Sequence, residues 1–181
     1  MLRVISGKYR SRILEQPPLE ITRATIDRIK EAIFNSIRFN LENKIVVDLF
    51  AGSANLAIEA LSNNAQKAYA VDNNLMAIKC IENNKKNLNL TNLEIICSNA
   101  EDFLNKLDFE CDYFFLDPPY KNINLLNNAL KIINNSNLLS QNGLIIIETD
   151  NDKEIIIPSN LQIKRKKQYG KINIIYLEKK E

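Results

Sequence analysis

The feature that most constrains the fold is the stretch IVVDLFAGSANLAIEAL, residues 45–61. It opens with a short β-branched run that ends at Asp48, and the apolar residues after Gly52 recur at helical spacing. This pattern predicts a strand, a tight turn and a helix packed on a sheet. Gly52 can adopt backbone conformations closed to other residues, and Ser53 is predicted to cap the helix. In an open α/β sheet such a turn lies at the carboxyl end of the strand, where small molecules bind.

The turn does not match a dinucleotide-binding fingerprint. Ala54 and Ala57 stand where G-x-G-x-x-G would place its later glycines, so a pyrophosphate seat, and with it NAD, is disfavoured. The turn instead fits a smaller ligand without phosphates, held by the carboxylate of Asp48. An ordinary buried turn between strand and helix is the alternative interpretation.

Composition narrows the class of protein. At 181 residues, with no long apolar run and no apolar leader in MLRVISGKYR, the chain is expected to be one cytoplasmic domain with a small appendage. It has no histidine, which removes imidazole bases and His-ligated zinc, and Cys80, Cys97 and Cys111 have no metal-binding spacing. We therefore expect no metal site and three buried thiols. The net charge is only +2, so binding of nucleic acid must depend on where the cations lie.

Residues 1–20 are predicted to form a basic arm. In RVISGKYRSRIL, apolar residues flank a turn at Gly7, which predicts a β-hairpin. The cations on its rim are Arg3, Lys8, Arg10 and Arg12. They fit contacts with a phosphate backbone, although a solvated hairpin face has the same pattern.

A helix is predicted within ITRATIDRIKEAIFNSIRF, residues 21–39, and is expected to begin near Thr25. Arg23 lies at its start, where a helix N-terminus can face a cofactor or an anionic backbone. Arg28 and Lys30 are expected to be plain surface charges.

A second strand is predicted in AYAVDNN, residues 68–74, and it ends at Asp72 with Asn73 beside it. Asp72 lies 20 residues after Gly52, the offset at which nucleotide-binding units place a carboxylate on ribose hydroxyls. The sequence therefore favours a sugar contact for Asp72 over capping of the next helix.

A third strand is predicted over Leu93–Cys97, followed by Asn99 and Ala100. The side chain of Asn99 and the amide of Ala100 suit the edge of an adenine. An Asx turn that caps the following helix is an equally good interpretation of these residues.

The most informative tetrapeptide is Asp117-Pro118-Pro119-Tyr120, which follows the apolar strand Tyr113–Leu116. A carboxylate at the end of a buried strand, followed by two prolines without amide donors, holds its acceptors in a fixed geometry. Asp117 and the Pro118 carbonyl can accept the two hydrogens of a planar amino group, and Tyr120 offers a ring for stacking. A Pro-Pro turn at the end of a strand is the structural alternative.

The remaining chain continues the alternation of helix and strand. A helix is predicted over Leu125–Leu139, a turn ending at Gly143, a strand over Leu144–Glu148, and a closing hairpin around Tyr169-Gly170. The run Lys164–Lys167 is interpreted as a solvated face that could add phosphate contacts.

Together these motifs resemble the Rossmann-like S-adenosylmethionine methyltransferases, and more closely the bacterial 16S rRNA guanine-N2 methyltransferases of the RsmD type. The resemblance runs almost end to end, through RVISGKYRSRIL, TRATIDRIKEAIF, VVDLFAGSANLAIEAL, VDNN, SNAEDFL, LDPPY and LIIIETD. It implies an α/β fold with a seven-stranded, mostly parallel sheet that ends in an antiparallel hairpin. The arm (1–20) would precede a methyltransferase domain (21–181). The chain departs from the family pattern at Ala24, Ala54, Asn55 and Ala57.

The resemblance also implies S-adenosylmethionine as the cofactor and a role for each matching residue. Its methionine end would meet Asp48 and the backbone around Gly52, its ribose Asp72 and its adenine Asn99 with Ala100. The expected cofactor site also includes Phe50, Ala51, Asn73 and Asp117. Residues 117–120 would bind the target base.

The implied reaction is methyl transfer to the exocyclic N2 of a guanine in 16S rRNA, either bare or within a 30S particle. The RNA would be bound by the arm cations together with Arg23. We expect a monomer that does not bind membranes.

Two alternatives stay open at this stage. N6-methylation of adenine in DNA or RNA uses the same tetrapeptide as that at residues 117–120. A non-catalytic RNA-binding assembly factor would explain the missing glycines after Gly52.

Overall fold

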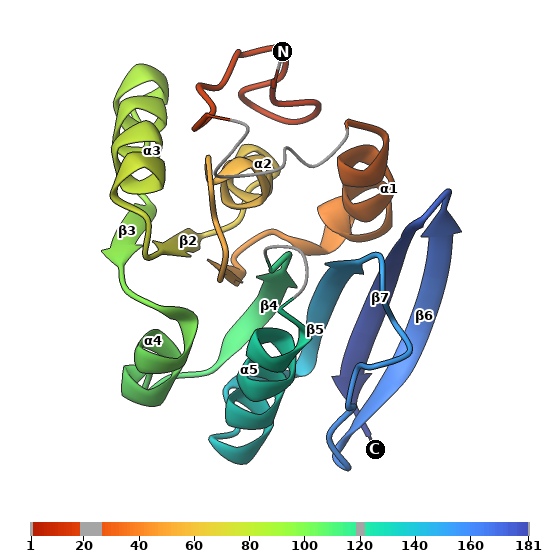
Figure 1. Ribbon diagram of the computed structural model, residues 1–181. Helices are drawn as coiled ribbons and strands as arrows, with labels where there is room; N and C mark the ends of the chain where they lie inside the picture. Colours follow the sequence, from red (N-terminus) through yellow and green to blue (C-terminus); the bar gives the residue numbers. More distant parts are fainter. Residues whose placement is uncertain (1, 19–26, 119–121, 181) are drawn as a thin grey trace.

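The computed structural model describes residues 2–18, 27–118 and 122–180, which fold into one sheet with helices on both faces (Figure 1). The strands are β1 Ile45–Asp48, β2 Lys67–Asp72, β3 Leu93–Cys97, β4 Cys111–Leu116, β5 Leu139–Thr149, β6 Leu161–Tyr169 and β7 Ile172–Lys179. The helices are α1 Asp27–Ile37, α2 Asn55–Ser62, α3 Leu75–Leu88, α4 Ala100–Lys106 and α5 Ile123–Asn135, with a 3₁₀ turn, η1, at Arg38–Asn40.

The seven strands follow the order β3-β2-β1-β4-β5-β7-β6. β1 to β5 run parallel to one another, whereas β7 lies between β5 and β6 and is antiparallel to both. The predicted fold class, a mostly parallel seven-stranded sheet closed by an antiparallel hairpin, is therefore confirmed. None of the helices in the described ranges is long and apolar enough to cross a bilayer.

The central strands are buried on both faces. α1, α2 and α3 cover one face and α4 and α5 cover the other (Figure 1). Successive residues of β4 serve opposite layers: Phe114 packs with α4 and α5, while the ring of Phe115 lies 5.8 Å from that of Phe34 on α1. Parallel strands covered on both sides need continuous apolar runs, which is what the sequence provides.

The connection between α5 and β5 differs from the prediction. α5 ends at Asn135, because Asn137 turns into the left-handed region at φ 52° and the Leu138 amide returns to the Ile133 carbonyl. β5 then starts at Leu139, so Gly143 lies inside a strand and not at the end of a turn. A Cβ at Gly143 would lie 2.8 Å from the Asp112 carbonyl oxygen, which explains the glycine.

The N-terminal arm packs on α2 and α3 (Figure 1). Arg3 and Ile13 form an antiparallel bridge, and the Val4 amide donates to the Arg12 carbonyl at 2.9 Å. Leu2, Val4 and Leu14 are buried in the same cluster as α1–α3. The predicted start of the first helix near Thr25 and the boundary between residues 20 and 21 lie outside the described residues.

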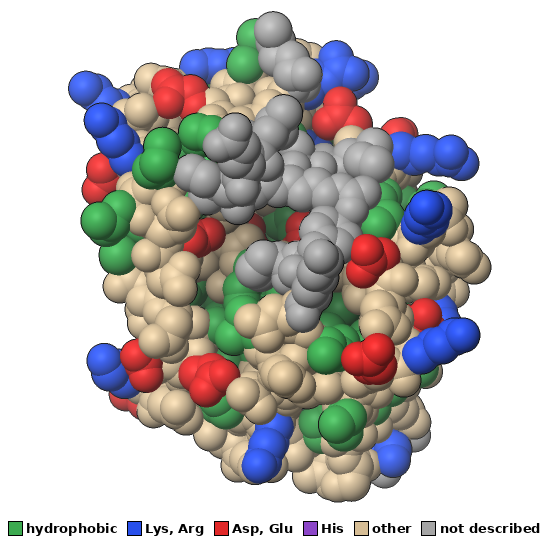
Figure 2. Space-filling view, in the orientation of Figure 1, with side chains coloured by type: hydrophobic (Ala, Val, Ile, Leu, Met, Phe, Trp, Pro, Cys, Tyr) green, Lys and Arg blue, Asp and Glu red, His purple; other side chains and the backbone are tan. Residues whose placement is uncertain are grey.

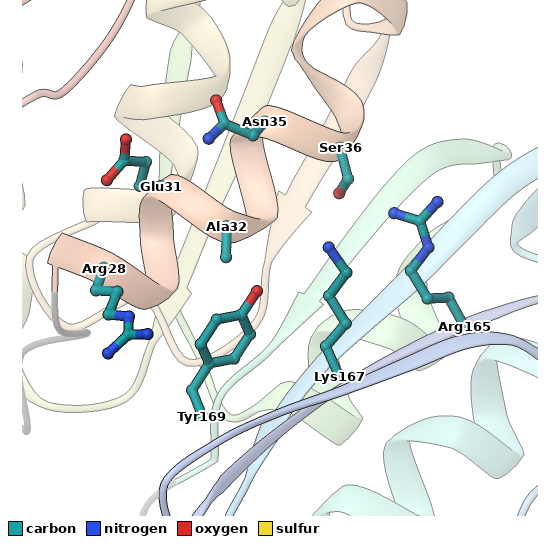
Figure 3. A pocket seen from close by; sticks show the side chains of 8 residues that line it. All are labelled: Arg28, Glu31, Ala32, Asn35, Ser36, Arg165, Lys167 and Tyr169. Carbon is teal, nitrogen blue, oxygen red and sulfur yellow. The ribbon is translucent and has the colours of Figure 1, made fainter.

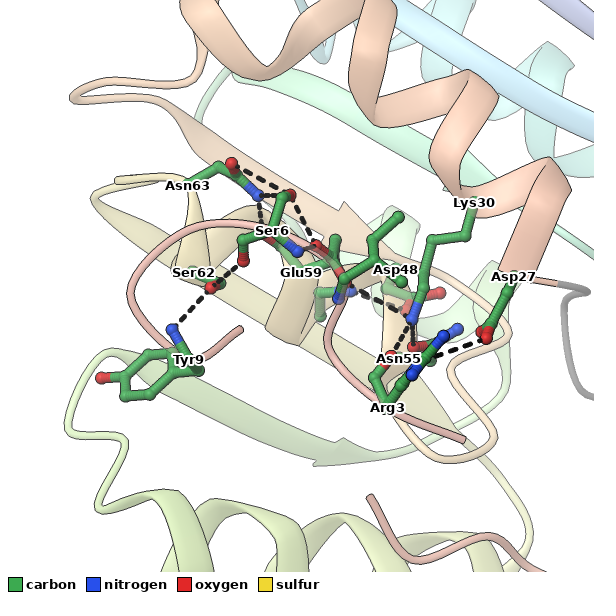
Figure 4. A network of polar contacts seen from close by, with 12 residues as sticks. Arg3, Ser6, Tyr9, Asp27, Lys30, Asp48, Asn55, Glu59, Ser62 and Asn63 are labelled. Carbon is green, nitrogen blue, oxygen red and sulfur yellow. Dashed lines mark hydrogen bonds and ion pairs between the residues drawn. The ribbon is translucent and has the colours of Figure 1, made fainter. Parts of the chain in front are cut away.

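Lys30 is fully buried, so its assignment as a surface charge was wrong. Its ammonium lies 3.4 Å from a carboxylate oxygen of Glu59 and 2.7 Å from Asn55 Oδ1, and it donates to the Arg3 carbonyl (Figure 4). Burial lowers the pKa of Lys30, and the adjacent Glu59 carboxylate opposes this shift. A buried partner on α2 is thus what allows a cation on the core-facing side of α1.

Glu59 also anchors the arm. Its carboxylate accepts hydrogen bonds from the backbone amides of Ile5 at 2.9 Å and Ser6 at 2.8 Å, and from the Ser6 hydroxyl at 2.7 Å (Figure 4). One buried carboxylate therefore connects the arm, α1 and α2.

We expect Glu59→Ala to lower the free energy of unfolding by about 3–5 kcal/mol, because it leaves Lys30 buried without a counter-charge. Urea unfolding measures the change. Adding Lys30→Met to this variant should recover part of the loss, since the buried charge is then gone. A single variant within about 1 kcal/mol of wild type would contradict the role given to the pair.

Candidate active site

Three carboxylates lie at the same edge of the sheet, on neighbouring strands. Asp48 ends β1, Asp72 ends β2 and Asp117 directly follows β4. The register aligns Asp48 with Ala70 and with Phe115, two residues before Asp72 and Asp117 respectively. In Figure 2 acidic side chains gather around a hollow near the middle of this face. The three carboxylates therefore lie at the carboxyl-terminal ends of neighbouring parallel strands.

Asp48 is the most perturbed acid of this group. It is buried, and its carboxylate accepts one hydrogen bond, at 3.2 Å, from the amide of Ala57 in the first turn of α2. Burial raises the pKa of Asp48 to about 7; the Ala57 amide opposes this shift, while the charges of Asp117 and Asp72 increase it. Because three carboxylates lie close together here, the site disfavours an anion and favours a cationic group.

The turn after β1 is built from backbone contacts. The Ala51 amide donates to the Val71 carbonyl at 3.0 Å, and Gly52 has φ 55°. The N-cap residue of α2 is Ala54, at φ 58°, and its side chain cannot cap the helix. The predicted capping role of Ser53 was therefore wrong. The carboxylate of Asp48 takes over that function through Ala57. Ala54 thus occupies a conformation that glycine adopts without strain.

Asp72 joins the two turns on which the site depends. One of its carboxylate oxygens accepts from the Gly52 amide at 2.9 Å, and the other accepts from the Asn74 amide at 2.8 Å. Asn74, not Asp72, caps α3 by accepting from the Met76 amide. Because a carboxylate can accept about four hydrogen bonds, Asp72 retains capacity for a ligand. Asn73 is exposed beside it.

Asn99 caps α4, which was the structural alternative for this residue. Its Oδ1 accepts from the Asp102 amide at 2.8 Å, and its Nδ2 donates to the Asp102 carboxylate at 2.7 Å. The side chain is exposed, and Ala100 is the first residue of α4, at the carboxyl end of β3. The pair therefore lies at the same edge as the three acids.

The other expected site residues follow β1 and β4 or lie outside the described residues. Asp117 and Pro118 are half-buried where β4 ends, whereas Pro119, Tyr120 and Arg23 lie outside the described residues. Phe50 is half-buried in the turn after β1.

The arm cations differ in their surroundings. Arg3 pairs with Asp27 at 3.6 Å, and Arg12 donates to the Asn87 carbonyl at 3.0 Å. Lys8 and Arg10 are exposed. All four lie on the surface.

The three cysteines are not equivalent, and the expectation of three buried thiols was wrong for one of them. Burial raises the thiol pKa of Cys80 to about 11 and that of Cys111 to about 12. Cys97 is exposed at the end of β3, in register with Asp72.

The side chains at this edge fit S-adenosylmethionine, which carries a sulfonium and an ammonium group. Three carboxylates stabilise such cations, whereas they would repel the pyrophosphate of a dinucleotide. No cluster of three or more acidic or thiol side chains within residues 2–18, 27–118 and 122–180 is arranged to hold a metal ion.

The strand order, the antiparallel closing hairpin and the acidic edge define the chain as a class I methyltransferase fold. A solved structure from Escherichia coli named as a methyltransferase, yhhF, superposes with a TM-score of 0.89 at 26% identity, over 98% of this chain and 97% of the other. A Haemophilus influenzae protein named as a methylase gives 0.85 at 29% identity over 99% of both chains.

The sequence comparison identifies the family. The profile described as "Conserved hypothetical protein 95" matches residues 2–178. Ribosomal RNA small subunit methyltransferase D of Haemophilus influenzae is 33% identical, over 93% of this chain and 89% of that protein. Its namesake from Escherichia coli is 28% identical, over 94% and 86%. The chain therefore belongs to this family, the RsmD family of methyltransferases.

The raised pKa of Asp48 predicts a pH-dependent stability. Between its ordinary value of 3.8 and about 7, the folded protein holds a proton that the unfolded chain has released. The free energy of unfolding therefore falls as pH rises through this interval, by at most about 4 kcal/mol at about 1.4 kcal/mol per pH unit.

We expect Asp48→Asn to remove this dependence, because an amide oxygen can still accept from Ala57 without being ionised. The variant should exceed wild type in stability at pH 8 by up to about 4 kcal/mol and should resemble it at pH 4. Urea unfolding at both pH values measures this. An equal difference at the two pH values would show that Asp48 does not titrate as described.

Proposed function

We propose that this protein transfers the methyl group of S-adenosylmethionine to the exocyclic N2 of a guanine in 16S rRNA. Methyltransfer and an rRNA substrate are supported by the family and by the names of its curated relatives. The choice of guanine N2 rests on the resemblance that combines the basic arm, the TRATIDR segment and the tetrapeptide at residues 117–120. The observation that carries the proposal is the convergence of Asp48, Asp72 and Asp117 at neighbouring strand ends.

The cofactor is assigned to the edge formed by β1, β2 and β3. Asp48 would attract the ammonium of its methionine end, and the spare acceptor capacity of Asp72 would bind the ribose hydroxyls. Asn99 already caps α4, so the adenine would be recognised chiefly by the backbone at Ala100. The turn of Phe50, Ala51 and Gly52 would let the ligand approach the main chain closely.

Catalysis would depend on position more than on a strong base. The Asp117 carboxylate and the Pro118 carbonyl would accept the two amino hydrogens of the guanine and direct the nitrogen lone pair toward the methyl carbon. Holding the two reactants in line can lower the barrier by about 7–11 kcal/mol. The nitrogen becomes cationic as it attacks, so its proton can leave to Asp117 or to water. This suits a chain that contains no histidine.

The RNA would be held by exposed cations of the arm. Lys8 and Arg10 make no ion pair within the described residues, while Arg3 and Arg12 have local partners and remain at the surface. Arg23 and the ring of Tyr120, assigned to RNA and to base stacking from the sequence, complete the proposed interface. Phosphate contacts of this kind fix orientation without reading sequence.

We expect Asp117→Ala to reduce methyl transfer by about 10²- to 10³-fold or more, because it removes an acceptor that acts in the transition state. Cofactor affinity, measured by calorimetry, should be largely unchanged. Asp117→Asn keeps one acceptor without the charge and serves as the matched control, with intermediate activity. Loss of cofactor binding with retained activity would contradict the proposed role.

Nucleoside analysis tests the target. Incubating 16S rRNA, bare or in 30S particles, with labelled cofactor should yield N2-methylguanosine after digestion. N6-methyladenosine as the labelled product would reassign the target base, and absence of cofactor binding at millimolar concentration would indicate a non-catalytic module.

A further inference from the structure

A cavity of about 310 Å³ lies between α1 and the edge strand β6 (Figure 3). α1 contributes Arg28, Glu31 and Ser36, and β6 contributes Arg165, Lys167 and Tyr169. In Figure 3 the side chains of Arg165 and Lys167 point across the cavity toward Ser36. Three cations and one acid thus give this groove a net positive charge.

The cations of β6 differ in their partners. Lys164 pairs with Glu178 at 2.7 Å, and Lys166 pairs with Asp152. Arg165 and Lys167 line the groove and face α1. None of the ion pairs within the described ranges includes Arg28, Arg165 or Lys167. The positive charge of the groove is therefore left without a carboxylate partner there.

Both arginines of the groove are oriented by aromatic rings. The guanidinium of Arg28 lies 5.8 Å from the ring centre of Tyr169, and that of Arg165 lies 5.9 Å from the ring centre of Tyr176. Tyr176 is held in turn by a hydrogen bond of 3.1 Å with Ser36. Stacking limits the freedom of a guanidinium and leaves its in-plane N–H groups available, which suits bidentate binding of phosphate.

The groove opens at the same edge as the candidate active site. Asn173 of β7 is in register with Thr149 at the end of β5 and with Gln168 near the end of β6. Tyr169 therefore lies at the end of the sheet where the acidic strand tips converge. At the start of α1, Arg28 follows Asp27, which pairs with Arg3 of the arm. Cations thus extend from the arm across the start of α1 into the groove.

We propose that this groove binds the phosphate backbone of the substrate RNA. The proposal rests on the proposed rRNA substrate and adds Arg28, Arg165 and Lys167 to its binding surface. RNA fits better than a small anion because the cations are spread over two elements and continue toward the arm, as a chain of phosphates requires.

The test compares two double variants of the full-length protein that remove the same charge from the same strand. Arg165→Gln/Lys167→Gln removes the groove cations, and Lys164→Gln/Lys166→Gln removes two cations of β6 that already pair with carboxylates. Binding of a fluorescently labelled 16S rRNA transcript is measured by anisotropy over a range of salt concentrations. Thermal unfolding and calorimetry with S-adenosylmethionine check that the fold and the cofactor site are unchanged.

We expect the groove variant to bind the transcript about tenfold more weakly near 0.1 M salt. The slope of log affinity against log salt should become shallower by about 1.5–2, because two phosphate contacts are lost. The variant that lacks the paired cations should keep the affinity and slope of wild type. Equal losses in the two variants would overturn the proposal by assigning the effect to net charge, and so would an unchanged groove variant.

Two further outcomes separate this proposal from the proposed function. If wild type methylates 16S rRNA but the groove variant retains its affinity, only the groove assignment fails. If wild type neither binds nor methylates the RNA, the proposed function fails with it. Polyglutamate that displaces a bound probe from the groove as effectively as RNA would assign the surface to an acidic protein and overturn the proposal.

Discussion

The buried contact between Lys30 and Glu59 is the interaction on which the other parts of this structure depend. Glu59 lies on α2, the helix that follows the turn after β1, and its carboxylate binds the arm amides and the α1 ammonium together. An isolated charge would be costly here, and the pair is tolerated because hydrogen bonds satisfy both partners. The same contact ties two surface elements that carry cations, the arm and the start of α1, to the helix beside the candidate active site.

A second constraint acts at the strand tips, where the fold brings carboxylates together. Asp48 is held away from water, between α2 and two neighbouring acids, so its proton affinity resembles that of a histidine. Asp72 is already bound to the amides of Gly52 and Asn74 and fixes the turn in the geometry that a ligand would meet. Negative charge concentrated in this way selects for a cationic cofactor, and the surrounding cations lie farther out, where the RNA phosphates would be.

Much of this could be predicted from the sequence, because apolar runs that end in acids specify buried parallel strands and one common edge. Leu93–Cys97 is a strand with the predicted bounds, and Asp48 and Asp72 end theirs. The failures involve contacts between segments distant in the sequence. Lys30 pairs with Glu59, which lies 29 residues away in the sequence. The first turn of α2 donates to the carboxylate of Asp48, not to the predicted cap Ser53. One local signal was available: Lys30 lies on the apolar stripe of its helix, between Ile26 and Ile33.

The unequal cysteines make the protein a convenient subject for spectroscopy. Cys80 and Cys111 remain protonated at neutral pH because burial disfavours their thiolates, and they are shielded from reagents. Cys97 is exposed one strand away from Asp72, at the edge assigned to adenosine. A maleimide fluorophore would therefore attach at one predetermined position in the natural sequence. Its emission would report occupancy of the neighbouring crevice in real time, without any engineered residue.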